Sequence, residues 1–291
     1  MKLNTNKLVI NSYFKFLRLL NKISPTINTK FYYFISHKKR LNLKEPKLFN
    51  EKMLYLKLKN ANNPLIIQCV DKYRVRDYVE SKGLPHILND LISVYDSIAD
   101  IDWQSLPNSF AMKLNTGSGN NLICRNKDDL DVEASKLKLA KFLANDDYLI
   151  YSELQYANVR KKIIVEKYLD QLDCEAPQDY KFYCFRGKVK YLQVNKWYKN
   201  HQVKSSIYNL DNLKQYGSFN HYIERAFEEP ENFLEMIDIA SKLSQDFPFV
   251  RVDLYNINHQ VIFGELTFTP CGGTIDFPSE LDKEMGDLIE L

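Results

Sequence analysis

The chain has 291 residues, of which 45% are apolar and 26% are charged, a balance typical of globular proteins with one large or two modest domains. Its 40 basic and 37 acidic residues leave a net charge of +3, which is too balanced for nucleic acid to be the main partner. The five cysteines are scattered, odd in number and form no C-x-x-C pair, so the sequence suggests neither a disulfide framework nor a zinc site and fits a reducing cytoplasm.

Residues 1–20, MKLNTNKLVINSYFKFLRLL, begin with basic residues but lack the uninterrupted apolar core and the cleavage site of a signal peptide. No run of residues approaches the length of a membrane span. A basic, aromatic segment of this kind can touch a membrane surface, but its pattern favours an amphipathic helix that packs on the rest of the protein. We therefore expect a cytoplasmic protein.

The first part of the chain is predicted to be helical. Residues 8–60 include apolar residues at spacings near 3.6, and Asn50 with Glu51 is placed to cap the run around Met53. NANNP, 60–64, is a break, and a second helix is expected over 65–85, ended by Gly83 and Pro85. A short strand and a loop follow up to residue 97.

From residue 107 onward, strands and helices alternate. Strands are expected over 107–115 and 121–126, a helix over 128–146 and a strand over 160–169. A hairpin over 179–198 turns at Arg186-Gly187, a helix over 231–247 opens after Pro230, and a second hairpin over 249–270 turns within 256–260. A helical N-terminal region followed by antiparallel strands and helices predicts the α+β class.

The loop between the strands at 107–115 and 121–126 is rich in glycine. MKLNTGSGNNLI, 112–123, places Lys113 just before Gly117 and Gly119. It is not a P-loop, because the pattern Gly-x4-Gly-Lys-Ser/Thr is absent. It is not a dinucleotide fingerprint either, because the third glycine is missing. Two readings remain: a flap whose N–H groups close over a triphosphate, and an ordinary β-turn, which the loop by itself favours.

The last hairpin places two acids on one face. With a register centred near residue 259, Asp253 and Glu265 are opposite each other, because facing residues of antiparallel strands share a side. The same face then carries Arg251, Thr267 and Thr269, and the other carries Val250, Val252, Leu254, Ile262 and Leu266. Two carboxylates in contact have two explanations: they bind Mg²⁺ together with a nucleotide, or they lie on a solvated sheet face where Arg251 neutralises them.

Two further stretches are ambiguous. IIVEKYLD, 163–170, runs from an apolar strand into Glu166-Lys167, where main-chain groups can meet an adenine, although a plain edge strand explains it as well. Lys72, Arg74 and Arg76 open a helix, a pattern that usually marks a solvated helix face.

These four features occur in an order that resembles the ATP-grasp superfamily and, more closely, the TupA-like ATP-grasp family, named for a teichuronopeptide biosynthesis protein. The resemblance runs from about residue 41 to 270. Its blocks are LNLKEPKLFNEKMLYLKL, DKYRVRDYV, KLNTGSGNNLICRNK, VEKYL, DYKFYCFRGKVKYLQV and RVDLYNINHQVIFGELTFTP. It implies a helical region over 1–64, a linker or small subdomain over 65–106, and two ATP-grasp subdomains over 107–169 and 170–291.

The resemblance also implies an ATP pocket between two antiparallel sheets. Lys72 and Lys113 would hold the α- and β-phosphates, beneath a flap over 115–121 that includes Thr116, Gly117, Ser118 and Gly119. The adenine would lie against Glu166 and the main chain of Lys167, Tyr168 and Leu169, and the ribose near Asp179.

Mg²⁺ would be held by Asp253, Glu265 and Thr267. Lys181 would reach the phosphates or the acceptor, and Arg251 would stabilise charge on the phosphoryl group or on the later tetrahedral intermediate. Two positions depart from the superfamily pattern. Thr267 replaces an asparagine, as a weaker or outer-shell ligand, and the flap has Thr116 and Asn120 where histidine and glycine are usual.

The activity implied is carboxylate–amine ligation through an acyl phosphate, with ATP and Mg²⁺, in cell-surface polysaccharide assembly. The substrates would be small-molecule or glycan-precursor acids and amines, with peripheral contact to membrane-associated polysaccharide machinery. Two alternatives stay open: a phosphotransferase or glycosyltransferase of the same pathway, and a non-catalytic nucleotide-binding partner.

Overall fold

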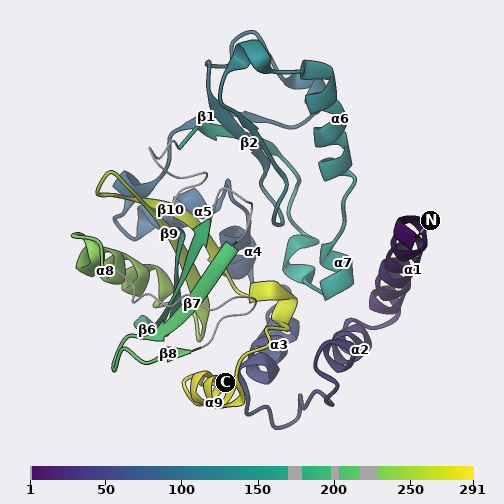
Figure 1. Ribbon diagram of the computed structural model, residues 1–291, viewed down its shortest axis with the longest axis vertical. Helices are drawn as coiled ribbons and strands as arrows, with labels where there is room; N and C mark the ends of the chain where they lie inside the picture. The colour runs from purple at the N-terminus through teal and green to yellow at the C-terminus, as the bar shows by residue number, and fades with distance from the viewer. Residues whose placement is uncertain (1, 170–178, 198–202, 217–228) are drawn as a thin grey trace. The chain divides into compact units, whose positions relative to one another are not determined.

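The computed structural model describes residues 2–169, 179–197, 203–216 and 229–291 (Figure 1). The chain divides into two compact units: residues 1–67, 146–158 and 269–291 form the first, and residues 68–145 and 159–268 form the second. The boundaries expected after residues 64, 106 and 169 stay predictions. Cys174, Tyr198 at the end of the expected hairpin, and the start of the last expected subdomain lie outside the described residues.

The first unit is helical. Its longer helices are α1 (Lys2–Ile23), α2 (Pro25–His37), α3 (Phe49–Lys59) and α9 (Ser279–Asp287), with the short α7 (Tyr148–Tyr151), η4 (Leu154–Tyr156) and η5 (Pro270–Gly273). Its three chain segments interlock: Asn28 Nδ2 donates to Ile150 O at 2.9 Å, and Asn50 Nδ2 donates to Ile275 O at 2.8 Å. A Cβ on Gly286 would lie 2.3 Å from Lys47 O, so α9 packs against the entry to α3 without room for a side chain.

The helix expected over 8–60 is three helices. Ser24 separates α1 from α2 and caps α2 by accepting from Ile27 N, and Lys38 ends α2 in the left-handed conformation. Asn50 is not a cap, contrary to the expectation. The helix begins at Phe49, so Asn50 lies inside it, and Glu51 instead accepts from the N–H groups of Lys47 and Leu48.

The helix expected over 65–85 is also interrupted. It consists of α4 (Pro64–Val70) and α5 (Val75–Ser81). Between them Asp71 Oδ1 accepts from the N–H groups of Tyr73 and Arg74, at 2.9 and 3.3 Å. An aspartate that bonds to following N–H groups offers the backbone an alternative to the helix, and here that alternative is adopted.

The second unit contains a four-stranded antiparallel sheet of order β1-β4-β2-β3. Its strands are β1 (Leu91–Tyr95), β2 (Phe110–Leu114), β3 (Asn121–Cys124) and β4 (Ile163–Lys167). One face packs into a core with Leu139 of α6 (Val132–Leu143) and includes Phe110, Met112, Leu122 and Val165. The alternate residues Lys113, Asn121 and Glu166 therefore point to the opposite face.

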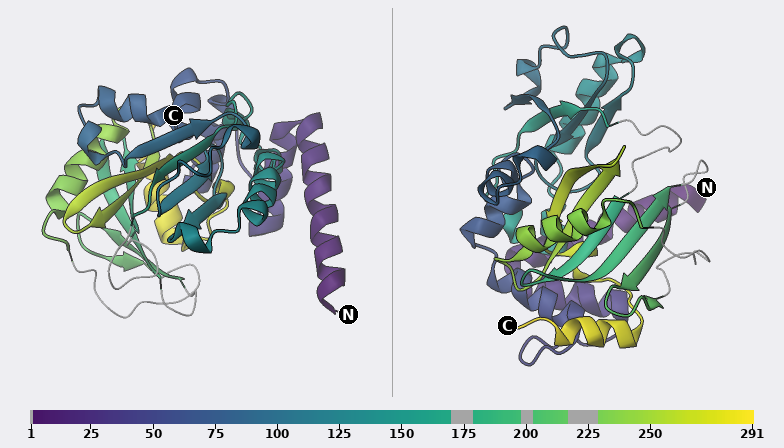
Figure 2. Two further views of the ribbon diagram at one scale, coloured as in Figure 1. Left: turned by 90° about the horizontal axis from the view of Figure 1, so that it is seen from above. Right: turned by 90° about the vertical axis from the view of Figure 1, so that its left-hand side faces the viewer.

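A six-stranded antiparallel sheet of order β10-β9-β5-β6-β7-β8 completes the unit. Its strands are β5 (Asp179–Phe185), β6 (Lys188–Trp197), β7 (Val203–Asn209), β8 (Gln215–Tyr216), β9 (Val250–Ile257) and β10 (Gln260–Thr267). Helix α8 (Phe233–Ser244) lies along one face (Figure 2, right). Both hairpins turn where expected: Arg186-Gly187 and Asn258-His259 have positive φ, as two-residue type I′ turns require.

The register of the last hairpin depends on a bulge. From the turn, Gln260 pairs with Ile257 and Phe263 with Leu254; after Gly264 the register shifts by one, so that Glu265 pairs with Asp253. The expected opposition of the two acids is confirmed. The shift moves Ile262 to the acid face, opposite Tyr255, instead of the core face predicted for it. Thr269 lies beyond the end of β10, where its hydroxyl donates to Glu153 in the first unit, so its expected place on this face is wrong.

The two sheets with their helices confirm the α+β class. No helix among the described residues is long and apolar enough to cross a membrane. Cys69, Cys124, Cys184 and Cys271 are free thiols, the first three of them buried.

Candidate functional site

The acid face of the six-stranded sheet is built by strand alternation. Asp179 and Lys181 on β5 lie opposite Tyr255 and Asp253 on β9, and Glu265 on β10 completes a row across three neighbouring strands. Because each strand alternates, the residues between them enter the core with α8, and the polar ones remain on one side. The predicted site residues of β5, β9 and β10 are thus brought together.

Three cations neutralise these acids. Arg251 forms a bidentate pair with Asp253, with Nε to Oδ1 and Nη2 to Oδ2 both at 2.7 Å. Lys181 Nζ lies 2.5 Å from Asp179 Oδ2 and 2.7 Å from Asp253 Oδ2. Burial disfavours the charge on Lys181, but Asp253 and Asp179 together outweigh it and the pKa of Lys181 is raised, so the ammonium is charged at neutral pH.

Glu265 is held as a carboxylate. Burial opposes its charge, but Lys72, Arg251 and Lys181 outweigh that cost and lower its pKa to about 2. Thr267 Oγ1 donates to Glu265 Oε1 at 3.0 Å and accepts from Arg251 Nη2 at 3.1 Å. The hydroxyl therefore sets the orientation of both charged groups.

Lys72 connects the acid face to the glycine loop. Its Nζ donates to Gly117 O at 2.5 Å and lies 3.5 Å from Glu265 Oε2. Its main-chain N–H donates to Asn115 O at 2.8 Å, which ties the lysine to the base of the loop. The pair Lys72 and Glu265, expected from separate motifs, thus meets in one place.

Asn115 anchors this junction and was not singled out for its side chain by sequence reasoning. It is fully buried. Its Nδ2 donates to Asp71 Oδ1 at 2.9 Å and to Arg160 O at 3.0 Å, and its Oδ1 accepts from Lys162 N at 2.7 Å. One amide therefore joins the turn before α5, the base of the loop and the start of β4.

The loop itself has the properties of an anion cradle. Gly117 and Gly119 have φ of 73° and 75°, a conformation that other residues adopt at a cost. The N–H groups of Thr116, Gly117, Ser118 and Gly119 have no hydrogen-bond partner within the described part of the chain. Ser118 and Gly119 are exposed at the tip, whereas Asn115 and Thr116 are buried at the base. The geometry is that of a hairpin loop, with free donors as a phosphate flap needs.

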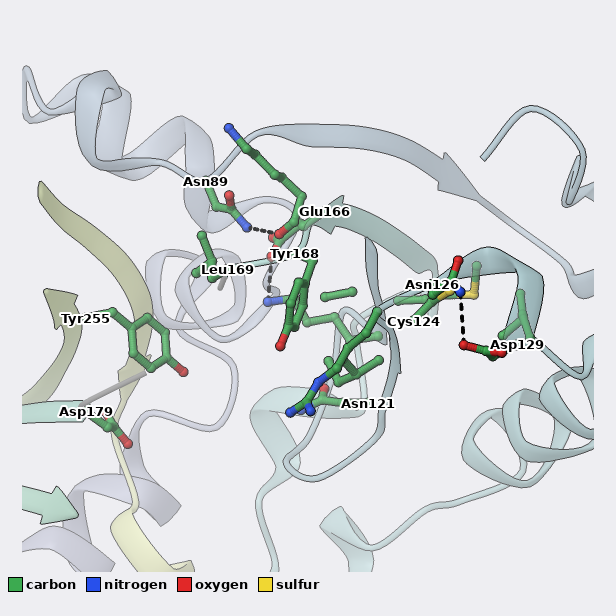
Figure 3. A pocket seen from close by; sticks show the side chains of 17 residues that line it. Asn89, Asn121, Cys124, Asn126, Asp129, Glu166, Tyr168, Leu169, Asp179 and Tyr255 are labelled. Carbon is green, nitrogen blue, oxygen red and sulfur yellow. Dashed lines mark hydrogen bonds and ion pairs between the residues drawn. The ribbon is translucent and has the colours of Figure 1, made fainter. Parts of the chain in front are cut away.

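A pocket of ≈ 720 Å³ adjoins the acid face within the second unit. Figure 3 shows Tyr255 and Asp179 on one side of it and Glu166, Tyr168 and Asn121 on the other. Lys113 also lines it and pairs with Glu166, Nζ to Oε2, at 2.6 Å. A volume of this size falls in the range of about 300–1,000 Å³ that is usual for small-molecule sites.

The segment Glu166 to Leu169 forms one wall, as expected. The main chain of Lys167 is already bonded on both sides, donating to Asp90 O and accepting from Asn89 Nδ2, each at 2.9 Å. The N–H groups of Tyr168 and Leu169 have no such partner among the described residues. Of the three residues expected to contact an adenine through the main chain, these two keep their donors available.

Asp179 presents an unpaired acceptor to the pocket. Its Oδ1 is buried without a hydrogen-bond partner in the described structure, whereas Oδ2 pairs with Lys181. Burial raises the pKa of Asp179, and Lys181 partly offsets that effect. A buried acceptor of this kind is costly unless a ligand donor, such as a sugar hydroxyl, meets it.

Tyr255 and Asn89 also line the pocket and were missed from the sequence. Tyr255 was within reach, because it lies two residues after Asp253 and therefore on the same face. Asn89 lies outside any strand, so strand alternation could not place it. It sits in the turn before β1, and its carbonyl accepts from Arg76 Nη1 at 3.0 Å, so Arg76 supports the pocket wall.

The family described as TupA-like ATPgrasp matches residues 51–290. The chain belongs to the TupA-like ATP-grasp family. The resemblance seen in the sequence is thereby confirmed, together with the ATP-grasp fold expected from it. A search of curated proteins found no match.

Solved ATP-grasp structures are similar to this TupA-like chain. A D-alanine–D-alanine ligase from Bacillus anthracis is 17% identical, with a TM-score of 0.47 over 76% of this chain and 66% of that one. D-cycloserine synthetase DcsG is 16% identical (TM-score 0.45; 77% and 70%). The ATP-grasp ligase PsnB, solved with a precursor variant, Mg and ADP, is 10% identical (TM-score 0.45; 83% and 66%). The TupA-like chain thus spans about two thirds of their length.

The donor set of the TupA-like chain fits Mg²⁺ that arrives with a nucleotide. Asp253 and Glu265 supply hard carboxylate oxygens from facing positions. Within the described ranges, no group of three or more His, Cys, Asp or Glu residues is arranged to hold a metal. Mg²⁺ commonly takes one or two carboxylates and completes its shell with phosphates and water, so two carboxylates suffice for an ion that arrives with a nucleotide.

Proposed function

We propose that the chain is a ligase that uses ATP and Mg²⁺ to join a carboxylic acid to an amine. The observation that carries the proposal is the row of Asp253 and Glu265 with Arg251 and Lys181 on one sheet face. Lys72 extends this row to the loop with free N–H groups. Such a row provides both a place for Mg²⁺ and three cationic side chains for phosphoryl transfer.

ATP is assigned to the ≈ 720 Å³ pocket. The adenine lies against Tyr168 and Leu169, and Asp179 Oδ1 accepts from a ribose hydroxyl. Lys113 and Lys72 hold the phosphates under the loop that contains Thr116, Gly117, Ser118 and Gly119. Glu166 has its place beside Lys113, at 2.6 Å, and sets the position of that ammonium. Lys167 contributes through its exposed side chain, because its main chain is already bonded.

The chemistry follows from the charges on the acid face. Asp253 and Glu265 would hold Mg²⁺, which would offset phosphate charge. Arg251 and Lys181 stabilise the charge that develops as the acid's oxygen attacks the γ-phosphorus and ADP leaves. The amine nitrogen then attacks the acyl carbon of the acyl phosphate, inorganic phosphate leaves, and the nitrogen loses a proton as the amide forms. Thr267 keeps Arg251 and Glu265 in place and takes the part of an outer-shell group.

The proposed substrates belong to cell-surface polysaccharide assembly. Family membership points to cell-surface polysaccharides such as capsule, O-antigen or teichuronic-type chains, or to their precursors. The acid and the amine would then be a sugar acid and an amino compound. A cytoplasmic location, where ATP and such precursors meet, and contact with membrane-associated polysaccharide machinery belong to the same proposal.

The test combines turnover with binding. The wild-type protein with Mg²⁺, ATP and a panel of uronic acids and amino acids should release ADP and phosphate only when acid and amine are both present. The double variant Asp253→Asn/Glu265→Gln should lose turnover by several orders of magnitude. The matched control Glu133→Gln/Asp238→Asn changes two exposed carboxylates on α6 and α8 and should behave as wild type.

Three outcomes would overturn the proposal. Intact turnover in the double variant would remove the metal assignment. A phosphorylated product, or a need for a nucleotide sugar, would show a transferase. ATP binding seen by calorimetry without turnover across the panel would show a non-catalytic nucleotide-binding protein.

A further inference from the structure

The first part of the chain carries charge of one sign. Residues 1–44 contain ten Lys and Arg and no Asp or Glu, whereas the rest of the chain contains 30 basic and 37 acidic residues. The near-neutral total therefore hides a strongly basic segment joined to an acidic remainder. This segment forms α1 and α2 and the loop after them.

Helix α1 exposes an apolar stripe. Its packed side is formed around Leu17 and Asn21, both buried. On another side Val9, Phe16, Leu19 and Ile23 are 65%, 46%, 58% and 70% exposed. At roughly 100° per residue these four fall within an arc of about 80°. Ordinary amphipathic helices put polar residues on the side away from the core, so this second apolar stripe needs a partner of its own.

Helix α2 continues the stripe. Ile27, Phe34 and Ile35 are 51%, 48% and 37% exposed, at positions that lie on one side of the helix. The rings of Phe16 on α1 and Phe31 on α2 meet edge to face, with centroids 5.4 Å apart, so the two stripes join. These residues, Val9, Phe16, Leu19, Ile23, Ile27, Phe31, Phe34 and Ile35, are called the α1–α2 stripe.

Lysines flank the α1–α2 stripe. Lys15, Lys22 and Lys30 are exposed beside it, and no acidic residue occurs on either helix. Lysine stems can cover apolar surface while the ammonium groups stay at the level of anionic headgroups. Exposed apolar residues bordered by lysines, on helices without acidic residues, are the pattern of helices that lie in the plane of a bilayer surface.

We propose that the α1–α2 stripe binds the surface of an anionic lipid bilayer, with both helices lying in the interface and Lys15, Lys22 and Lys30 contacting headgroup phosphates. The occupant is a lipid surface because the charge and the apolar stripe coincide on one side of the same two helices. This inference goes beyond the proposed ligase activity and does not depend on it, since none of these residues belongs to the candidate site.

The experiment measures binding of the full chain to vesicles by flotation. Vesicles of phosphatidylcholine alone are compared with vesicles of equal parts phosphatidylcholine and phosphatidylglycerol, at low and at high salt. The protein should float with the anionic vesicles at low salt, and binding should weaken as salt screens the lysines.

Two variants separate charge from apolar contact. Lys15→Glu/Lys22→Glu/Lys30→Glu should lower the partition onto anionic vesicles by at least about tenfold. Leu19→Gln/Ile23→Gln should lower it to a similar degree while the charge is unchanged. Arg18 is left in place because it pairs with Asp147 at 2.9 Å. The control Leu137→Gln/Leu234→Gln alters side chains 65% and 80% exposed on α6 and α8 and should bind as wild type.

Circular dichroism on each variant confirms that the exposed substitutions leave the fold intact. Equal flotation with both vesicle types, or unchanged flotation of either stripe variant, would overturn the proposal. Light scattering tests a different partner. If the wild type is a dimer and Leu19→Gln/Ile23→Gln is a monomer, the α1–α2 stripe binds a second copy of this chain and the lipid proposal is overturned. Binding of wild type only to an acidic protein, and not to vesicles, would likewise overturn it.

Discussion

Replacing Asn115 by alanine tests the anchor beneath the loop. The substitution removes three side-chain hydrogen bonds, to Asp71, Arg160 O and Lys162 N, from a fully buried position. At roughly 1–1.5 kcal/mol per bond with partners left partly buried, the free energy of unfolding should fall by about 3–5 kcal/mol. Shifts of about 2–4 °C per kcal/mol for a domain of this size then predict a melting temperature lower by about 6–20 °C.

The assay is thermal unfolding followed by circular dichroism, with urea unfolding for the free energy. Asn42→Ala is the matched control, because the Asn42 side chain also makes three hydrogen bonds, to Lys44 N, Glu45 N and Glu45 O, but at an exposed position that does not line the pocket. It should cost about 1 kcal/mol or less. At a temperature where both variants are folded, Asn115→Ala should also weaken ATP binding, since Lys72 and the loop share its anchor. A melting shift no larger than that of Asn42→Ala would refute the reasoning.

Three further changes probe other parts of the molecule. A Cβ on Gly264 would lie 2.8 Å from Asp253 O, so Gly264→Ala should destabilise the hairpin by about 1–3 kcal/mol in urea unfolding and reduce Mg²⁺-dependent turnover. Burial lowers the pKa of Lys57 from 10.5 to about 8, although the charge of Glu153 acts in the opposite direction. Between pH 8 and 10.5 the unfolded chain therefore binds more protons than the folded one, so the free energy of unfolding should rise with pH over this range. Lys57→Met should remove that rise and should stabilise the protein at pH 7. Thr267→Val removes the hydroxyl that bonds both Arg251 and Glu265. Loss of the one bond to the metal-binding Glu265, at about 1 kcal/mol, should raise the Mg²⁺ concentration for half-maximal turnover by about fivefold.

Each of these has its own contrary result. A Gly264→Ala protein as stable as wild type would show that the bulge can relax. The difference in unfolding free energy between wild type and Lys57→Met is taken at each pH, because the contribution of the tyrosines is the same in both proteins and drops out. A difference that does not change with pH would contradict the lowered pKa of Lys57. If Thr267→Val has the same Mg²⁺ dependence as wild type, the Thr267 hydroxyl does not orient Glu265 for metal binding.

Strand alternation was the strongest signal in the sequence. It placed Arg251, Asp253 and Glu265 on one face because the period of two survives in any antiparallel hairpin. It failed at Ile262, since the two-residue turn at Asn258-His259 and the extra residue at Gly264 shift the near half of the strand by one. A bulge of this kind leaves no periodic trace; only a glycine within the strand marks it.

The helix break at Asp71 and the role of Asn115 could not be derived from local pattern. Aspartate is tolerated in a helix as well as in a turn, and the choice here depends on the amide of Asn115, 44 residues along the chain, which bonds the same carboxylate oxygen. Contacts between distant polar side chains follow no spacing rule. For the same reason, the sequence could not predict that Asp179 Oδ1 has no partner among the described residues or that the carbonyl of Lys167 accepts from Asn89.

The division of the first unit among three stretches of chain also has a consequence for biosynthesis. Asn50 and Lys52 on α3 bond to Ile275 and Ile289, so the partners of the early helices are translated last. At the usual rate of about 5–20 residues per second, the ribosome needs roughly 10–45 seconds between residue 67 and residue 291. Throughout that interval the nascent chain carries helices whose docking surfaces do not yet exist. A chaperone that holds such a segment during synthesis should therefore raise the yield of folded protein.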